Sequence, residues 1–139
     1  MSSSIERHGS GAPWESIAGY SRVVRAGERV LVAGTTATIG DGAIAGLGDP
    51  GAQTRQAIEN VAAALEKAGA SLADVVRTRM YVTDIERWED VARAHGEAFG
   101  DHPPVTTMVQ VAALIDPRML VEIEAEAILP SASVRPGTP

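Results

Sequence analysis

Two amphipathic helical segments stand among five strand-like segments, and this balance limits how the chain can fold. Between Asp49 and Gly69, and again between Asp84 and Gly100, apolar residues recur at the spacing of one helix face. An Asp before each segment and a Gly after it are typical helix boundaries. Because two helices can cover only one face of a sheet, we expect an α+β domain whose other sheet face is covered by oligomerisation.

The strand-like segments are recognised by their content of β-branched residues and by the alternation of apolar and polar residues. Residues 21–36 contain two such runs separated by a short turn, which predicts a hairpin that ends near Gly34 and Thr35. Three further segments follow at 75–82, 106–114 and 119–129. In the last of them, apolar residues alternate with glutamates, so one side of this strand is expected to be polar.

Composition excludes several kinds of function. The 139 residues carry 12 Lys and Arg against 18 Asp and Glu, a net charge of −6, and no basic stripe for nucleic acid is apparent. The chain has no cysteine, which removes thiolate nucleophiles and Cys-based metal sites. His95 and His102 have no third ligand within sequence reach, and no cofactor motif occurs, so we expect neither metal nor cofactor. No apolar run approaches the length of a membrane span, so a cytoplasmic location is expected.

The ends of the chain differ from its body. Residues 1–15 and 130–139 are small, polar or proline-rich, and we interpret both as flexible tails around one domain at 16–129. Within the first helical segment, Glu59 and Asn60 fall on the polar side and are expected to face solvent. His95 falls on the apolar side of the second, where a packed, hydrogen-bonded histidine is the ordinary expectation.

Several segments together resemble one known family, and the most specific are the PPVTTMVQVAAL and LVEIEAEAI stretches. With GYSRVV, VLVAGTT and the helical segment up to YVTDI, they are similar to the Rid family, also called YjgF, reactive intermediate deaminase or endoribonuclease L-PSP-like. The resemblance implies a chorismate-mutase-like fold, with a mixed sheet and two helices on one face. It also implies a homotrimeric barrel with clefts between subunits, in which members hydrolyse enamines and imines.

The resemblance also implies a set of site residues. Glu122 matches the family's acidic residue and is the expected catalytic group, although one of three alternating glutamates could equally be a solvated strand residue. The expected substrate-binding residues are Tyr20, Gly34, Thr35, Thr106, Thr107 and Met108. Thr106 stands where active deaminases have an arginine that binds the substrate carboxylate, and a hydroxyl cannot replace a bidentate guanidinium. Arg79 and Arg93 are the candidates for a replacement cation.

Three functions follow as alternatives. The first is an imine or enamine deaminase with an altered substrate, for which Glu122 would activate water. The second is a ligand-binding or regulatory trimer without catalysis, which the loss of the arginine at residue 106 favours. The third is RNA cleavage or translation inhibition, described for some relatives but opposed by the acidic composition.

Overall fold

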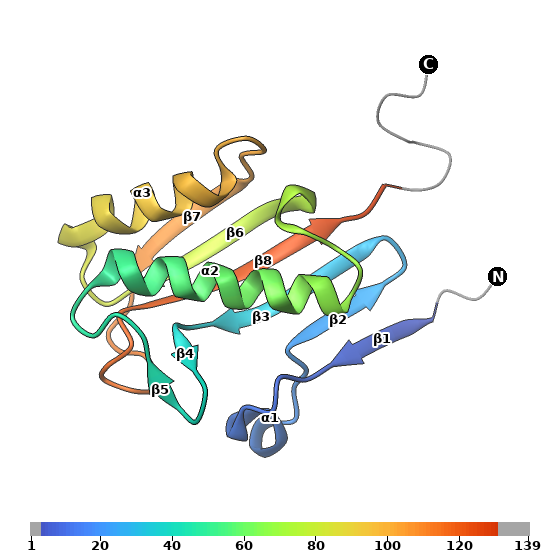
Figure 1. The fold of residues 1–139 in the computed structure, drawn as a ribbon, viewed down its shortest axis with the longest axis horizontal. Helices are drawn as coiled ribbons and strands as arrows, with labels where there is room; N and C mark the ends of the chain where they lie inside the picture. Colours follow the sequence, from blue (N-terminus) through green and yellow to red (C-terminus); the bar gives the residue numbers. More distant parts are fainter. Residues whose placement is uncertain (1–3, 131–139) are drawn as a thin grey trace.

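The computed structural model describes residues 4–130 and contains one six-stranded sheet with helices packed on one face (Figure 1). The strands of this sheet are β1 (Ile5–His8), β2 (Val23–Ala26), β3 (Arg29–Thr35), β6 (Val75–Val82), β7 (Val105–Gln110) and β8 (Val121–Ile128). The helices are α1 (Pro13–Ala18), α2 (Pro50–Lys67) and α3 (Trp88–Phe99), with short 3-10 turns at Leu72–Asp74 and Ile85–Arg87. A separate two-stranded hairpin joins β4 (Thr38–Ile39) and β5 (Ala43–Ile44).

The strand order is β1-β2-β3-β8-β6-β7, and it makes the sheet mixed. Only β6 and β7 pair in parallel, and α3 connects them as a crossover. All other neighbours in the sheet are antiparallel, so the long connection from β3 through α2 to β6 leaves room for β8 between them. The predicted α+β class, with two long helices on one face of a mixed sheet, is confirmed.

Helix α2 has the ends that its sequence predicts. Asp49 accepts a hydrogen bond from the Ala52 amide at 3.1 Å, and Pro50 occupies the first turn. Its apolar side, with Ile58, Val61 and Leu65, is buried against the sheet. The core between helices and sheet therefore consists mainly of aliphatic side chains from α2, β3, β6 and β8.

The N-terminal segment contains more regular structure than its composition indicates. A strand at Ile5–His8 pairs antiparallel with β2, and a helical turn at Pro13–Ala18 follows it, although a flexible tail was expected over 1–15. Ordered backbone therefore begins before the predicted boundary at residue 16. The expected C-terminal tail lies outside the described residues beyond Pro130.

The sheet face away from the helices is not covered within this chain. Leu31, Val105 and Val109 are among its exposed apolar residues, at 40%, 60% and 43% exposure. Apolar strand residues on an open sheet face are typical of a surface that another copy covers. Within residues 4–130, no helix is both long and apolar enough to cross a bilayer.

Candidate functional site

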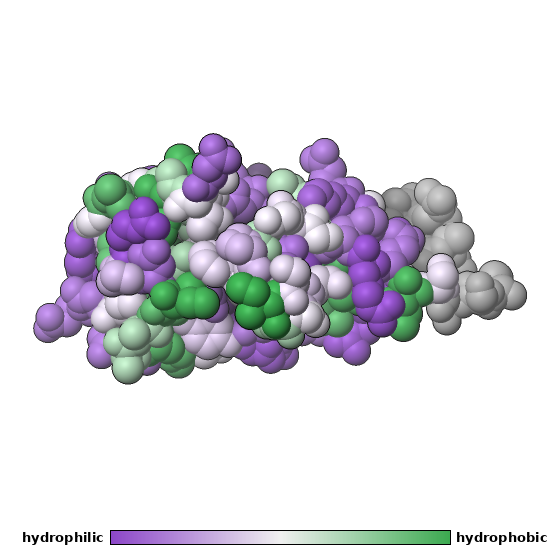
Figure 2. Space-filling view, turned by 90° about the horizontal axis from the view of Figure 1, so that it is seen from below, coloured by the Kyte–Doolittle hydropathy of each residue, from purple (hydrophilic) through white to green (hydrophobic). Residues whose placement is uncertain are grey.

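A cleft of about 680 Å³ lies at one end of the sheet, between α1, the β4–β5 hairpin and α2. Its walls include Tyr20, Gly34, Thr35 and Glu122, four of the residues predicted for the site. The exposed Ile39 and Ile115 also line it, while Ile17 stands exposed on α1. Figure 2 views the molecule from the side of α1 and the hairpin and shows separate apolar patches among polar ones. The cleft can thus offer both polar and apolar contacts to a small molecule.

Glu122 projects from β8 beside the backbone of Gly34. A Cβ atom on Gly34 would lie 2.6 Å from Glu122 Oε2, so the carboxylate occupies the space that a side chain would need. Gly34 also lies where the β3–β8 register shifts, between Val32 and Thr35. Gly34 therefore combines a place at a strand irregularity with a close approach of the Glu122 side chain to its backbone.

The pKa of the Glu122 carboxyl is raised above its ordinary value. Burial is the main cause, the neighbouring Glu124 adds to it, and the positive charge of Arg22 opposes it. Glu124 and Glu126 instead form ion pairs with arginines on the open sheet face. Glu122 is therefore distinct from the other two glutamates of its strand, and it has the raised pKa typical of carboxylates that transfer protons.

Arg22 is the buried cation of the cleft, at 8% exposure, and sequence reasoning did not identify it. Its Nη1 donates to the Gly34 carbonyl at 2.6 Å and to Thr35 Oγ1 at 3.1 Å. Its Nη2 donates to the Tyr20 hydroxyl at 3.1 Å. Three of the predicted substrate-binding residues thus share one guanidinium.

Glu15 from α1 holds Arg22 in place. Arg22 Nε lies 3.3 Å from Glu15 Oε2, and both side chains are largely buried. Burial alone would raise the pKa of Glu15, but hydrogen bonds from the Ser10 hydroxyl and amide, together with Arg22, hold that pKa below its ordinary value. The ion pair is therefore fully charged at neutral pH, and it fixes α1 against the start of β2.

Two side-chain amides on α2, those of Asn60 and Gln53, form hydrogen bonds to backbone segments around the cleft. Asn60 Nδ2 donates to the carbonyls of Thr36 and Thr38 at 2.9 and 2.8 Å. Asn60 is partly buried and lines the cleft, so the expectation that it faces solvent is wrong, whereas Glu59 is exposed as expected. The fully buried Gln53 binds the Arg118 carbonyl and the Leu120 amide, and so fixes the chain just before β8 and Glu122.

The three predicted residues on β7 lie elsewhere in this chain. Thr106, Thr107 and Met108 belong to the edge strand, which β6 separates from β8, and among the described residues none of them lines the cleft. Thr106 Oγ1 instead accepts a hydrogen bond from Thr78 Oγ1, which also contacts His95 Nε2. Within one subunit, the structure therefore brings together only part of the predicted site.

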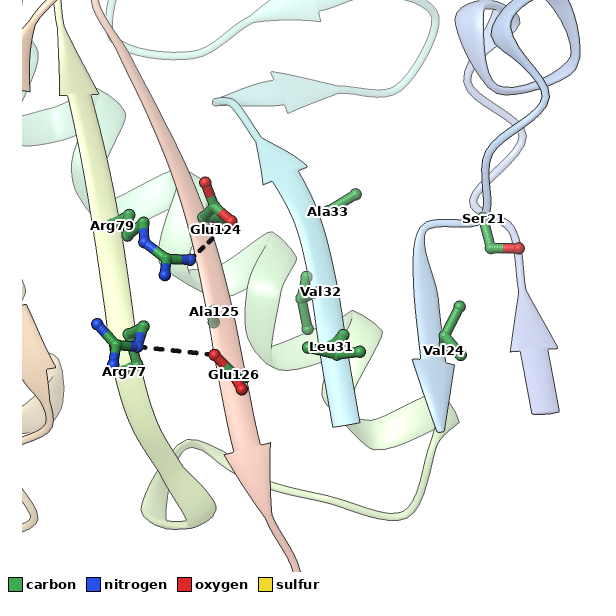
Figure 3. Close-up of a pocket in the computed structure, with 10 residues that line it drawn as sticks. All are labelled: Ser21, Val24, Leu31, Val32, Ala33, Arg77, Arg79, Glu124, Ala125 and Glu126. Carbon is green, nitrogen blue, oxygen red and sulfur yellow. Dashed lines mark hydrogen bonds and ion pairs between the residues drawn. The ribbon is translucent and has the colours of Figure 1, made fainter. Parts of the chain in front are cut away.

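Neither predicted replacement cation lines the cleft. Arg79 pairs with Glu124 at 3.4 Å on the open sheet face, beside the ion pair of Arg77 and Glu126 (Figure 3). Arg93 is 73% exposed on α3 and pairs with Glu89. Arg79 and Arg93 are each engaged by a carboxylate outside the cleft, whereas Arg22 and Lys67 line it.

The described residues offer no evident metal site, since no group of three or more His, Asp or Glu side chains converges within residues 4–130. His95 is buried against Phe99, with ring centroids 4.6 Å apart, and its pKa is lowered by burial. It is thus the packed, hydrogen-bonded histidine that its position on α3 predicts. Among the described residues, the cleft offers the carboxylates of Glu122 and Asp41, the Tyr20 hydroxyl and the cations of Arg22 and Lys67.

Comparisons with known proteins agree with this fold. A family model described as "Endoribonuclease L-PSP" matches residues 10–129. A member of the YjgF/YER057c/UK114 family from Mycobacterium tuberculosis has a crystal structure with a TM-score of 0.82 and 54% identity, covering 91% of this chain and 100% of that one. An uncharacterised Streptomyces coelicolor protein is 43% identical over 126 residues, 91% of this chain and 93% of its own length. The structure of E. coli TdcF with bound serine has a TM-score of 0.73 and 28% identity, covering 88% and 92% of the two chains.

Proposed function

Since this chain belongs to the endoribonuclease L-PSP family, also known as the YjgF or Rid family, we propose that it hydrolyses small imines or enamines. The observation that carries this proposal is Glu122, a half-buried carboxylate with a raised pKa, held at the wall of a ligand-sized cleft. A carboxylate in this state binds water and accepts a proton from it more readily than an exposed glutamate does.

The reaction needs only water as a second reactant. Glu122 accepts a proton as a water oxygen bonds to the imine carbon, and the C=N electron pair moves to nitrogen, which takes up a proton. Transfer of a further proton to the nitrogen of the resulting carbinolamine lets the C–N bond break, so ammonia or an amine leaves and a carbonyl forms. Glu122 gives the proton that it accepted to this nitrogen, and the carbinolamine hydroxyl loses its proton to water as the carbonyl forms. That proton replaces the one that water supplied to the imine nitrogen, so the enzyme ends the cycle unchanged. The tyrosine hydroxyl of Tyr20 is placed to contact the substrate.

We propose further that the complete site forms at the seams of a homotrimer. Exposed Val105 and Val109 on the β7 edge are suited to bury against a second copy. In such an assembly the β7 residues Thr106, Thr107 and Met108 of one copy would complete the cleft of another. Counting the chains per particle by native mass spectrometry tests this part of the proposal directly.

A non-catalytic role is the alternative that one observation favours. TdcF, which has the same fold, has a structure with bound serine, so a protein of this fold binds a small molecule. Thr106 replaces the arginine expected in active deaminases, and such a cleft could bind a metabolite and report its level without turnover. RNA cleavage is not favoured, because the net charge is −6 and the guanidinium of Arg22 in the cleft is already paired with Glu15.

The deciding experiment measures ammonia released from short imines generated in situ, with wild type beside Glu122→Gln. We expect turnover by the wild type and its loss in the variant, because the amide cannot accept a proton from water. Glu97→Gln, an exposed glutamate on α3, is the matched control and should keep full turnover. A folded wild type without turnover on any imine, but with a saturable bound metabolite, would replace this proposal by the binding role.

A further inference from the structure

Arg22 lines a ligand cleft, but most of its N–H groups already donate hydrogen bonds to the protein itself. A guanidinium has five N–H groups. Arg22 uses them in four hydrogen bonds, to Glu15, Gly34, Thr35 and Tyr20. A bidentate grip on a carboxylate needs two adjacent N–H groups in one plane, so Arg22 could form one only by releasing bonds to the cleft wall.

The charges around Arg22 also disfavour an anionic ligand. Glu15 neutralises the guanidinium within a largely buried ion pair. Glu122 adds a carboxylate to the same cleft; burial is the main cause of its raised pKa, which attraction to Arg22 opposes and repulsion by Glu124 increases. Of the other cations, Lys67 lines the cleft but donates to the Gly9 carbonyl at 2.7 Å. A ligand carboxylate beside Glu122 would meet repulsion from Glu122, and the guanidinium of Arg22 that could offset it is already paired with Glu15. Lys67 has no carboxylate partner among the described residues, but its ammonium is held at the Gly9 carbonyl.

We propose that Arg22 is the positioning residue of the cleft, and that its engagement by the cleft wall makes this site select imines that carry no carboxylate. This inference rests on the proposed function for the reaction, although its binding preference stands without turnover. An iminium group, which is cationic when protonated, would lie favourably beside Glu122. The substrate class is thus the imine of a simple aldehyde or ketone, and the imine of a 2-oxo acid is disfavoured.

A matched pair of stable cyclic imines tests the preference. 1-Pyrroline and 1-pyrroline-2-carboxylate differ only in the carboxylate, and their binding to the full-length protein is measured by chemical-shift titration. We expect 1-pyrroline to bind at least about tenfold more tightly, since an unpaired carboxylate in a partly dry site is costly. Equal or tighter binding of the carboxylate, or no binding of either imine, would overturn the inference.

The positioning role is tested through Glu122, by following its side-chain carbon during a pH titration. Replacement Arg22→Gln removes the nearby cation, so the pKa of Glu122 should rise further, whereas Arg22→Lys should restore part of the difference. Arg55→Gln has the same charge change at an exposed site on α2 and should leave the Glu122 titration unaltered. An unchanged Glu122 pKa in a folded Arg22→Gln protein would exclude the positioning role.

These measurements separate the inference from the proposed function. Preferential binding of 1-pyrroline with no ammonia release from any imine would support the inference and reject catalysis. Turnover that prefers the imines of 2-oxo acids would support catalysis and reject the inference, and would direct attention to a cation of the neighbouring subunit.

Discussion

The hydroxyl groups of Thr78 and Thr106 lie 2.7 Å apart across the parallel strands β6 and β7. Thr78 Oγ1 donates this hydrogen bond, and it therefore accepts one from His95 Nε2 at 2.8 Å. Because Thr106 only accepts in this chain of hydrogen bonds, its own hydroxyl proton is not used within the chain. A neutral donor thus stands at the residue where the sequence resemblance implies an arginine in active deaminases.

The first prediction concerns this chain of hydrogen bonds. Replacement Thr78→Val keeps the shape of a fully buried side chain but leaves the His95 nitrogen without its partner. We expect the free energy of unfolding to fall by about 1–3 kcal/mol in urea denaturation. Thr107→Val, on the exposed side of β7, is the control and should change stability by less than about 0.5 kcal/mol. An equal loss of unfolding free energy in the two variants would mean that the buried hydrogen bonds of Thr78 do not contribute to stability.

The second prediction is a pH dependence of stability that comes from His95. Burial lowers its pKa below the ordinary 6.5, so the unfolded chain binds a proton at a higher pH than the folded protein does. The contribution of neutral His95 to stability is thus complete above pH 6.5 and is lost as the pH falls toward the folded-state pKa. In His95→Gln, the fall in unfolding free energy between pH 8 and pH 5 should be smaller. An identical pH profile for variant and wild type would contradict this assignment.

The third prediction separates stability from function at Glu122. Its raised pKa means that the ionised carboxyl is less favourable in the folded protein than in the unfolded chain. Its contribution to stability is therefore largest below the ordinary 4.5 and is lost as the pH rises through the folded-state pKa. At pH 7, Glu122→Gln should unfold at the same temperature as wild type or a higher one, while imine turnover is lost. Glu97→Gln should show no such gain, because Arg55 lowers the pKa of Glu97.

Much of the fold could be predicted from the sequence because the signals are local. The caps of α2 and the alternation in β8 each depend on residues close in the chain, and both match the structure. Membership of the family, predicted from the resemblance, is confirmed. Strict alternation in residues 75–82 puts Val76 on the same face as Thr78, Met80 and Val82, but a register shift between Val75 and Arg77 leaves Val76 42% exposed while the other three are buried. Such a bulge has no signature in the alternation itself.

The site residues that the sequence analysis did not predict, Arg22 and Asn60, contact groups that are distant from them in the sequence. Arg22 binds groups on β3 and α1, and its role follows only when those elements meet. One local signal was present, because residues two apart in an extended chain point the same way. Tyr20, a predicted cleft residue, therefore implied that Arg22 faces the cleft as well. Asn60 gave no such signal, because it binds the carbonyls of Thr36 and Thr38, which lie more than 20 residues before it in the sequence.

The fourth prediction tests the close approach at Gly34. In Gly34→Ala the added Cβ would meet Glu122 Oε2 at 2.6 Å, so the carboxylate must move. We expect a loss of about 1–3 kcal/mol in unfolding free energy together with a displaced Glu122 titration. The control is Gly96→Ala on α3, where no atom lies within 4 Å of an added Cβ. Alanine in a helix interior should stabilise that variant by about 0.5–1 kcal/mol. An undisplaced Glu122 titration in Gly34→Ala would show that the two groups are not in contact.

The last prediction concerns the edge strand and the proposed trimer. Val109 is 43% exposed on β7, and in the proposed assembly its side chain is buried against a second copy. A lysine at this residue would have to lose its hydration at the seam, so Val109→Lys should shift the protein from trimers toward single chains in sedimentation velocity. Trp88→Lys, an exposed apolar residue on α3, is the control and should leave the assembly intact. If the seam completes the cleft, the dissociated Val109→Lys protein should also bind 1-pyrroline more weakly while its fold is unchanged. A variant that dissociates but binds this imine as tightly as wild type would place the whole site within one subunit.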